Sequence, residues 1–154
     1  FSATITREPN YTFAHDEKIL EKINRVARSR VIDFVNRKFL LPRGKGIVMT
    51  KASYDRIWER ILNRQNQDST TILGCFCDWD NSPRKSYNSI IMQGTTAQKF
   101  KGYFKQLFRK AQDIGSPMIV INAWNEWAEG AYMEPDEKNG YAFLEAVKEA
   151  KETG

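Results

Sequence analysis

The run TILGCFCDW, residues 71–79, decides the fold class because its residues are apolar almost without interruption. A strand with one face in water alternates apolar and polar side chains, whereas a strand buried on both faces of a parallel sheet does not. Residues 118–124 form a second such run, and residues 47–49 form a shorter one. The sequence therefore predicts three neighbouring, buried, parallel strands.

Helical patterns alternate with these runs. Apolar side chains recur every three or four positions in residues 16–36, 54–62, 95–114 and 140–151, a spacing typical of helices with one buried face. Thr95 and Gln98 match a capping box at the start of the third helix, and Gly115 and Pro117 would end it. Strands and helices in this order form an open doubly wound sheet or part of a (β/α)8 barrel, and periodicity does not choose between them.

The chain has 154 residues with 41% hydrophobic content, enough for the core of a single domain over residues 1–154. A complete (β/α)8 barrel takes about 250 residues, so in a barrel this chain is roughly the C-terminal half. The start at Phe1 also indicates a fragment, since residues 1–10 lack the features of a signal peptide. Because a partial barrel leaves strand edges exposed, we expect the fragment to self-associate.

Several classes of protein are disfavoured by composition. No apolar run approaches the roughly 20 residues of a membrane span. Cys75 and Cys77 point to the same face of a strand, so we interpret them as reduced, buried thiols. With His15 they supply fewer ligands than the four usual at zinc, and no metal or cofactor is expected.

The net charge of +5 raises the question of nucleic-acid binding. Basic residues are frequent in residues 25–45, but most lie between the apolar positions of the first predicted helix. A solvated helix face explains that arrangement, so we expect no nucleic-acid partner.

The residues that indicate chemistry follow the two long apolar runs, where parallel folds place their functional loops. Glu126 and Glu129 follow the second run together with Trp124, Asn125 and Trp127. Aromatic rings pack against the C–H faces of sugars, while carboxylates and amides bind sugar hydroxyls. These residues therefore predict a glycan site.

The first long run ends in a second candidate group, Trp79, Asp80, Asn81 and Arg84. Both loops would leave the same end of the sheet, so we expect this group to reach the same cleft as Glu126. Asp80 is interpreted as a hydrogen-bond partner of the substrate, although Asp78 and Asp80 alternate onto one face and could share a cation. Arg84 could instead anchor its own turn through Asp80.

Breaking a glycosidic bond requires one carboxylic acid that protonates the leaving oxygen and a second carboxylate that assists at the sugar carbon. Glu126 and Glu129 can fill these parts, and the adjacent aromatics would raise a carboxyl pKa by desolvation. Alternatively, Trp124 and Trp127 close the core while the acids pair with Arg84 or lysines. The same residues would also suit a noncatalytic glycan-binding module.

At these residues the sequence resembles a known family. Residues 123–130, AWNEWAEG, followed by Glu134-Pro135-Asp136, are similar to the signature of the WbsX-type glycosyltransferases, which are related to the endo-α-mannosidases of glycoside hydrolase family 99. Residues 79–84, WDNSPR, resemble a second motif, with Ser82 in place of Thr. The resemblance covers roughly residues 45–150.

The resemblance implies a (β/α)8 barrel that acts in the cytoplasm on glycans of lipopolysaccharide or capsule, without a metal. It also implies that the acid at Glu126 draws the proton from the sugar's 2-hydroxyl and that the acid at Glu129 protonates the leaving oxygen. Glu134 joins the expected substrate contacts. Ala128 departs from the hydrolases, which tend to carry His there, and this departure argues against hydrolysis and against a preference for mannose.

Overall fold

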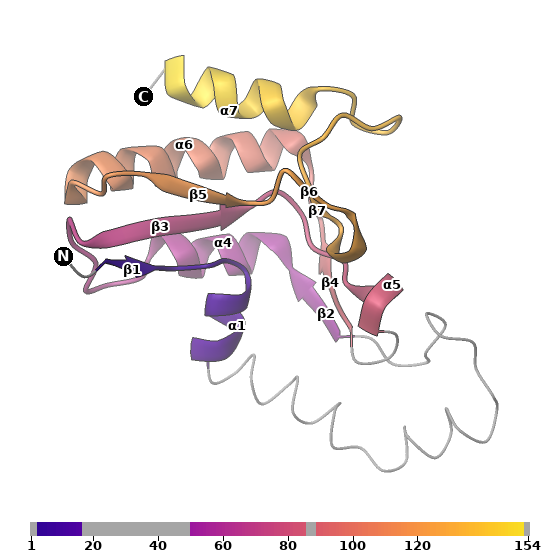
Figure 1. Cartoon of the computed structure of the whole chain (residues 1–154), viewed down its shortest axis with the longest axis horizontal. Coiled ribbons are helices and arrows are strands. Elements are labelled where there is room, and N and C mark those ends of the chain that lie inside the picture. Colours follow the sequence, from indigo (N-terminus) through magenta and orange to yellow (C-terminus); the bar gives the residue numbers. More distant parts are fainter. Residues whose placement is uncertain (1–2, 17–49, 86–88, 153–154) are drawn as a thin grey trace, which may run out of the picture.

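The computed structural model describes residues 3–16, 50–85 and 89–152. Its main sheet has the order β1-β3-β5 and contains β1 (Thr4–Ile5), β3 (Thr71–Phe76) and β5 (Ile119–Asn122), all parallel (Figure 1). The two long apolar runs are therefore neighbouring parallel strands, as predicted. The other neighbour of β3 is β1, which the sequence did not reveal because two residues are too few to show a pattern. The predicted strand at 47–49 lies outside the described residues.

Two smaller sheets extend the C-terminal end of the main sheet. The strand β2 (Thr50–Ser53) pairs in parallel with β4 (Ile90–Gln93), and β6 (Asn125–Glu126) forms an antiparallel hairpin with β7 (Ala131–Tyr132). Residues 80–94, for which the sequence predicted neither a helix nor a strand, contain the helix α5 (Ser82–Lys85) as well as β4. Both elements are too short for periodicity to detect.

Three predicted helices are confirmed as α4 (Tyr54–Leu62), α6 (Ala97–Ile114) and α7 (Ala142–Glu152). The cap of α6 is Thr96, whose hydroxyl accepts a hydrogen bond from the Lys99 amide at 3.1 Å, rather than the predicted Thr95. Gly115 ends α6 in a left-handed conformation, as expected. The long helix predicted from residue 16 falls outside the described residues. A short helix, α1 (Asn10–His15), follows β1.

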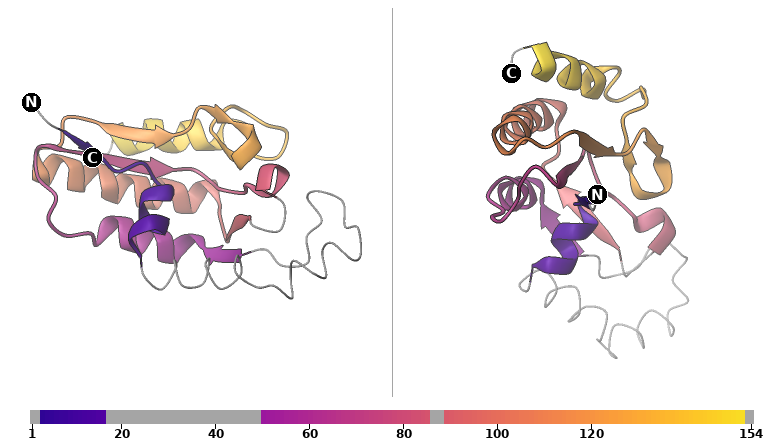
Figure 2. Two further views of the ribbon diagram at one scale, coloured as in Figure 1. Left: turned by 60° about the horizontal axis from the view of Figure 1, so that its bottom comes forward. Right: turned by 60° about the vertical axis from the view of Figure 1, so that its left-hand side comes forward.

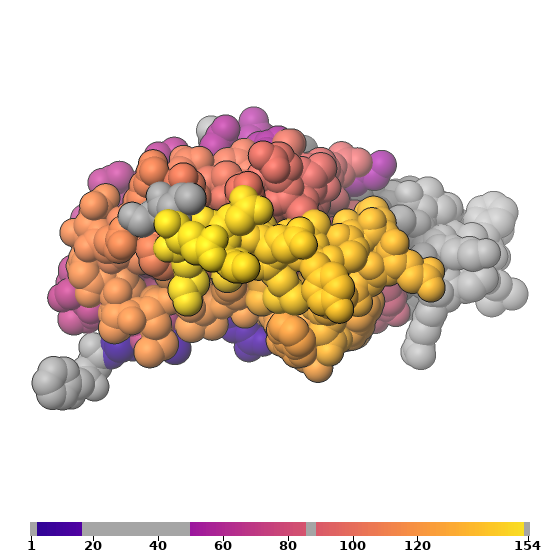
Figure 3. Space-filling view, turned by 90° about the horizontal axis from the view of Figure 1, so that it is seen from above, coloured from indigo at the N-terminus to yellow at the C-terminus, as the bar shows by residue number. Residues whose placement is uncertain are grey.

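The helices α4 and α6 pack on one side of the sheet, and α7 lies on α6 (Figure 2). In the view from above, α7 and the segment leading into it form much of the visible surface (Figure 3). The core between sheet and helices is strongly aromatic: Trp58 of α4 stacks on Phe76 of β3 with ring centroids 5.8 Å apart. Phe100 of α6 meets Phe143 of α7 edge-on at 5.6 Å. The fold is thus mixed α/β, with parallel strands and helices.

A buried ion pair fixes the chain where it leaves β1. The carboxylate of Glu8 is fully buried and accepts hydrogen bonds from Arg64 Nη1 at 2.6 Å and from the Thr12 amide at 3.1 Å. Arg64 also donates to the Thr12 hydroxyl at 2.7 Å. A buried charge is tolerated only when it is paired and hydrogen-bonded, so Glu8 requires both Arg64 and the Thr12 amide. The resulting network joins α1 to the end of α4.

Cys75 and Cys77 are free and buried in the core, which confirms their interpretation as small apolar residues. Burial raises the pKa of both thiols, that of Cys77 to about 11. Both thiols therefore stay protonated at neutral pH. Among the helices of the described residues, none has the length and apolar character that crossing a membrane requires.

Candidate functional site

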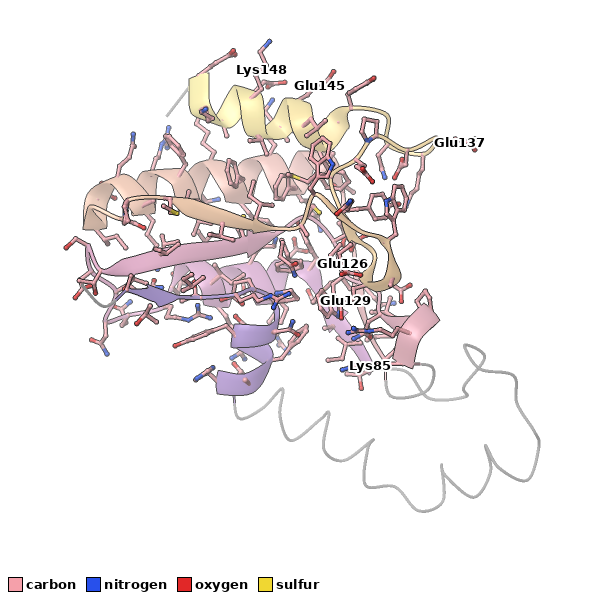
Figure 4. The ribbon with its side chains drawn as sticks, in the orientation of Figure 1. Lys85, Glu126, Glu129, Glu137, Glu145 and Lys148 are labelled. Atoms are coloured by element: carbon pink, nitrogen blue, oxygen red, sulfur yellow. The ribbon has the colours of Figure 1, made fainter. Side chains whose placement is uncertain are left out.

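The loops that follow β3 and β5 meet at the C-terminal end of the main sheet. The Asp80 amide donates to the Glu129 carbonyl oxygen at 2.7 Å, and the Arg84 guanidinium forms an ion pair with the Glu129 carboxylate. Figure 4 shows Glu126 and Glu129 close together beside α5. The two candidate groups therefore adjoin, as expected from strands that end at one edge.

The hairpin β6–β7 carries both glutamates. Between its strands lies a single turn of 3-10 helix, η2 (Trp127–Glu129), which Gly130 ends with φ of +60°. A Cβ atom at this glycine would lie 2.9 Å from the Asp80 amide nitrogen. Both the backbone conformation and the close approach require glycine at position 130. This requirement explains why the motif AWNEWAEG, residues 123–130, ends in glycine.

The two glutamates differ in environment. Glu129 is only 7% exposed and is paired with Arg84, whose side chain is half exposed. Glu126 lies on β6 and is partly exposed. One of the two acids, Glu129, thus pairs with Arg84, as the alternative interpretation predicted. The carboxylate partner of Arg84 is Glu129 and not Asp80, which the turn-anchor hypothesis had named. The separation of roughly 5 to 10 Å between the two carboxyl groups that suits a glycosidic pair stays a prediction.

Other residues of the first loop hold its conformation. Asp80 Oδ1 accepts from the Ser82 amide at 2.9 Å, and the buried Asn81 accepts from the Ile90 amide through Oδ1 at 2.8 Å. Trp79 is also buried, with its ring edge-on to Phe13 at 6.2 Å. Trp79 and Asn81 therefore form the base of the loop, and the substrate contacts expected for them stay predictions.

The two tryptophans of the second loop face solvent. Trp124 is 52% exposed and Trp127 is 49% exposed, so the alternative in which both close the core is wrong. Asn125 between them is exposed as well. Glu134 Oε2 accepts from Trp127 Nε1 at 2.6 Å, so this predicted substrate contact holds the indole in place. The exposed rings are available to a ligand.

Three polar residues near this site were not among the predicted contacts. Tyr132 stacks on Trp127 with ring centroids 3.7 Å apart and donates to Asp136 Oδ2 at 2.9 Å. Asp78 lies two residues after β3, and its Oδ1 accepts from the Thr95 hydroxyl at 2.7 Å and from the Trp79 amide at 2.8 Å. Desolvation raises the pKa of Asp78. Two of the three had a signal in the sequence: Asp136 belongs to the Glu134-Pro135-Asp136 motif, and Asp78 alternates with Asp80 onto one face.

The described part of the chain contains no cluster of three or more His, Cys, Asp or Glu side chains arranged to hold a metal ion. Asp78 and Asp80, which the sequence places on one face, use their Oδ1 atoms in hydrogen bonds to the backbone and to Thr95. The described side chains thus favour hydrogen bonding by these two residues over a shared cation.

Comparison with known proteins places the chain in a family. The family model described as glycosyltransferase WbsX matches residues 1–147. The uncharacterized protein WxcX from two strains of Xanthomonas campestris pv. campestris is 36% identical over 90 residues, which cover 56% of this chain and 13% of the relative. The chain thus matches only a small part of these longer proteins, and no solved structure matches it. With a family match across nearly its whole length, the chain belongs to the WbsX glycosyltransferase family.

Proposed function

We propose that the chain is the site-bearing part of an enzyme that makes or breaks glycosidic bonds in the metabolism of bacterial lipopolysaccharide or capsule. The observation that carries the proposal is the segment that follows β5, where Glu126 and Glu129 lie within a few residues of the two half-exposed indoles of Trp124 and Trp127. Carboxylates provide acid–base chemistry, and exposed indoles provide faces for sugar rings. Membership of the WbsX family favours transfer of a sugar, and the related alternative is hydrolysis.

The proposed architecture of the whole protein is a cytoplasmic (β/α)8 barrel to which β1, β3 and β5 contribute neighbouring strands. Three parallel strands with their functional loops at one end support this proposal. In such a barrel the remaining strands would bring further side chains to the mouth, opposite Glu126. The sugar and the linkage would then depend on residues from both halves.

The ion pair gives Arg84 a part in the proposed chemistry. A positive charge beside a carboxylate favours its ionised form, so the ion pair with Arg84 opposes protonation of Glu129. To protonate a leaving oxygen, Glu129 must first take up a proton from solvent, and a substrate hydroxyl or carboxylate that draws Arg84 away from Glu129 makes this uptake easier. Glu126 would meanwhile accept the proton of the sugar's 2-hydroxyl. Binding of substrate at Arg84 thereby prepares the acid.

The test replaces Glu126 or Glu129 by Gln in the full-length protein. Gln keeps the shape of Glu but removes its acid or base function, so activity should fall at least about 10²-fold. Activity is measured as restoration of surface polysaccharide in a strain that lacks the gene. The matched control is Glu145→Gln on the exposed side of α7, far from the hairpin in Figure 4, which should restore wild-type levels. Normal polysaccharide from the double Gln variant would refute the proposal.

A noncatalytic glycan-binding module is the second candidate, and the exposure of Trp124 and Trp127 favours it equally. Such a module would need the indoles but not the acids. Both Gln variants would then restore polysaccharide, while Trp124→Ala and Trp127→Ala would not. A sugar that raises the unfolding temperature without being turned over would also support the module.

A further inference from the structure

A groove beside the proposed catalytic hairpin forms a second candidate binding site. It has a volume of about 690 Å³, within the roughly 300–1,000 Å³ range of small-molecule sites. Its aromatic walls are Trp127, Tyr132 and Tyr141, and its polar lining is Asp136, Glu137 and Lys138. Trp127 belongs to both the groove and η2, so the groove continues directly from the hairpin that carries Glu126 and Glu129.

The aromatic wall is held rigidly. Trp127 and Tyr132 are stacked at an interplanar angle of 18°, and each has its polar atom fixed, Trp127 by Glu134 and Tyr132 by Asp136. Partial desolvation and the hydrogen bond to Asp136 raise the pKa of Tyr132 to about 12, so its hydroxyl remains a donor at neutral pH. Aromatic surface held in this way binds with little loss of side-chain entropy.

The polar part of the lining is preformed by a tight turn. The Asp136 carboxylate accepts from the Asn139 amide and, at 2.8 Å, from Asn139 Nδ2, while the Gly140 amide donates to the Asp136 carbonyl at 2.8 Å. Asp136 therefore ties the turn to Tyr132. Tyr141, immediately after the turn, is 65% exposed and presents its ring to the groove.

Charge and shape identify the kind of occupant. The lining has two carboxylates, Asp136 and Glu137, against the single ammonium of Lys138, which disfavours phosphates and nucleic acid. Aromatic faces combined with carboxylates suit a ring that has C–H faces and many hydroxyls. We propose that this groove binds a neutral sugar unit of the glycan, next to the bond on which Glu126 and Glu129 act.

This inference rests on the proposed function, but its test does not require turnover. The full-length Glu126→Gln/Glu129→Gln variant is applied to an array of neutral bacterial polysaccharides, acidic bacterial polysaccharides and heparin. The dissociation constant is then measured for the neutral polysaccharide that binds most strongly. If the binding test fails, the sugar site in the groove is refuted. If the complementation test fails, the catalytic role of Glu126 and Glu129 is refuted.

In this background, Tyr141→Ala should raise the dissociation constant by about three- to tenfold, the scale of one aromatic contact, while Tyr141→Phe should change it by less than about twofold. The control is Met118→Ala, which alters a residue of similar exposure, 55%, outside the groove at the start of β5. Any of four results would overturn the inference. Tyr141→Ala could leave the affinity unchanged, or Met118→Ala could weaken it equally. The protein could also prefer acidic polymers, or bind no neutral polysaccharide.

Discussion

At the scale of single residues, the ion pair between Arg84 and Glu129 can be tested directly by substitution. Arg84→Gln would leave a nearly buried carboxylate without its cation, and we expect the free energy of unfolding to fall by about 1–3 kcal/mol. Polysaccharide synthesis should fall with it if Arg84 engages the substrate. Urea unfolding and complementation measure the two effects separately.

The neighbouring Lys85 provides the control for this substitution. It carries the same charge on the same short helix and is exposed. Lys85→Gln should change the free energy of unfolding by no more than about 0.5 kcal/mol, as is usual for surface substitutions. If Arg84→Gln and Lys85→Gln lowered the free energy of unfolding equally, the ion pair would add no stability beyond that of any positive charge on α5.

Asp78 yields a prediction with a defined pH dependence. Desolvation raises its pKa, so ionisation costs stability as pH rises above the ordinary aspartate value, and the cost is complete once pH passes the raised value. Asp78→Asn removes the charge, and its Oδ1 can still accept from Thr95 and Trp79. The variant should therefore gain stability over wild type as pH rises from 3 to 7, measured by thermal unfolding.

Asp78→Ala separates charge from hydrogen bonding at the same position. It removes the acceptor of both hydrogen bonds and should cost about 1–3 kcal/mol at neutral pH. If Asp78→Asn is no more stable than wild type at pH 7, the carboxylate is better solvated than its position suggests. If it is more stable but inactive, Asp78 has a role in function.

The sequence predicts candidate site residues by type and position, but not what each side chain contacts. Glu126, Glu129, Trp124 and Trp127 are candidates because acids and indoles together follow a buried strand. The contact of Trp79 with Phe13 and the hydrogen bond between Asn81 and Ile90 could not be foreseen, since Phe13 is distant in sequence and Ile90 lies in a short strand. Local patterns do not encode such long-range contacts.

At the scale of elements, the β6–β7 hairpin depends on one glycine. Gly130→Ala would place a Cβ atom against the Asp80 backbone at positive φ, so the hairpin or the β3 loop must move. We expect a loss of about 1–3 kcal/mol and a larger loss of function, because the same movement displaces Glu129. Thermal unfolding and complementation give the two values.

Gly102 is the matched control for this prediction. It lies within α6, and a methyl group added at that position would have open space within 4 Å. Gly102→Ala should stabilise the protein by about 0.5–1 kcal/mol, because alanine favours the helix. A stabilising effect of Gly130→Ala would contradict the tight contact with Asp80.

The long elements were predictable because their apolar stripes extend over several turns, as in α4 and α6. Short elements were not: β1, α5, β4 and the hairpin strands have two to four residues each. They are held by hydrogen bonds across the chain, such as Met92 to Trp79 at 2.8 Å. Their formation is a consequence of tertiary structure rather than of propensity.

At the scale of the whole molecule, β5 lies at one edge of the described main sheet. Apolar side chains are exposed at or beside the two outer strands, namely Ile5, Met118 and Val120. Because exposed strand edges pair with other chains, we expect the isolated fragment to form dimers or larger species in light scattering. Val120→Lys should reduce them, and a wild-type fragment that stays monomeric would contradict this expectation.

The fold class followed from the sequence because a continuously apolar run is incompatible with a one-sided surface strand. The parallel pairing of residues 71–76 with residues 119–122 confirms that inference. A barrel was not decided by the sequence, since open and closed parallel sheets share one alternating pattern. Closure depends on strands beyond the three of the main sheet.

The two buried thiols can report how often the core of the protein opens. In the native state Cys75 and Cys77 are shielded and protonated, so an added alkylating reagent finds almost no reactive sulfur. Labelling must wait until the segments that cover these thiols open, among them the β6–β7 hairpin, whose Tyr132 carbonyl oxygen accepts a hydrogen bond from the Cys77 thiol at 3.1 Å. The rate at which the protein takes up the reagent at neutral pH therefore measures how often the core around Cys75 and Cys77 opens, without denaturant and without an introduced probe.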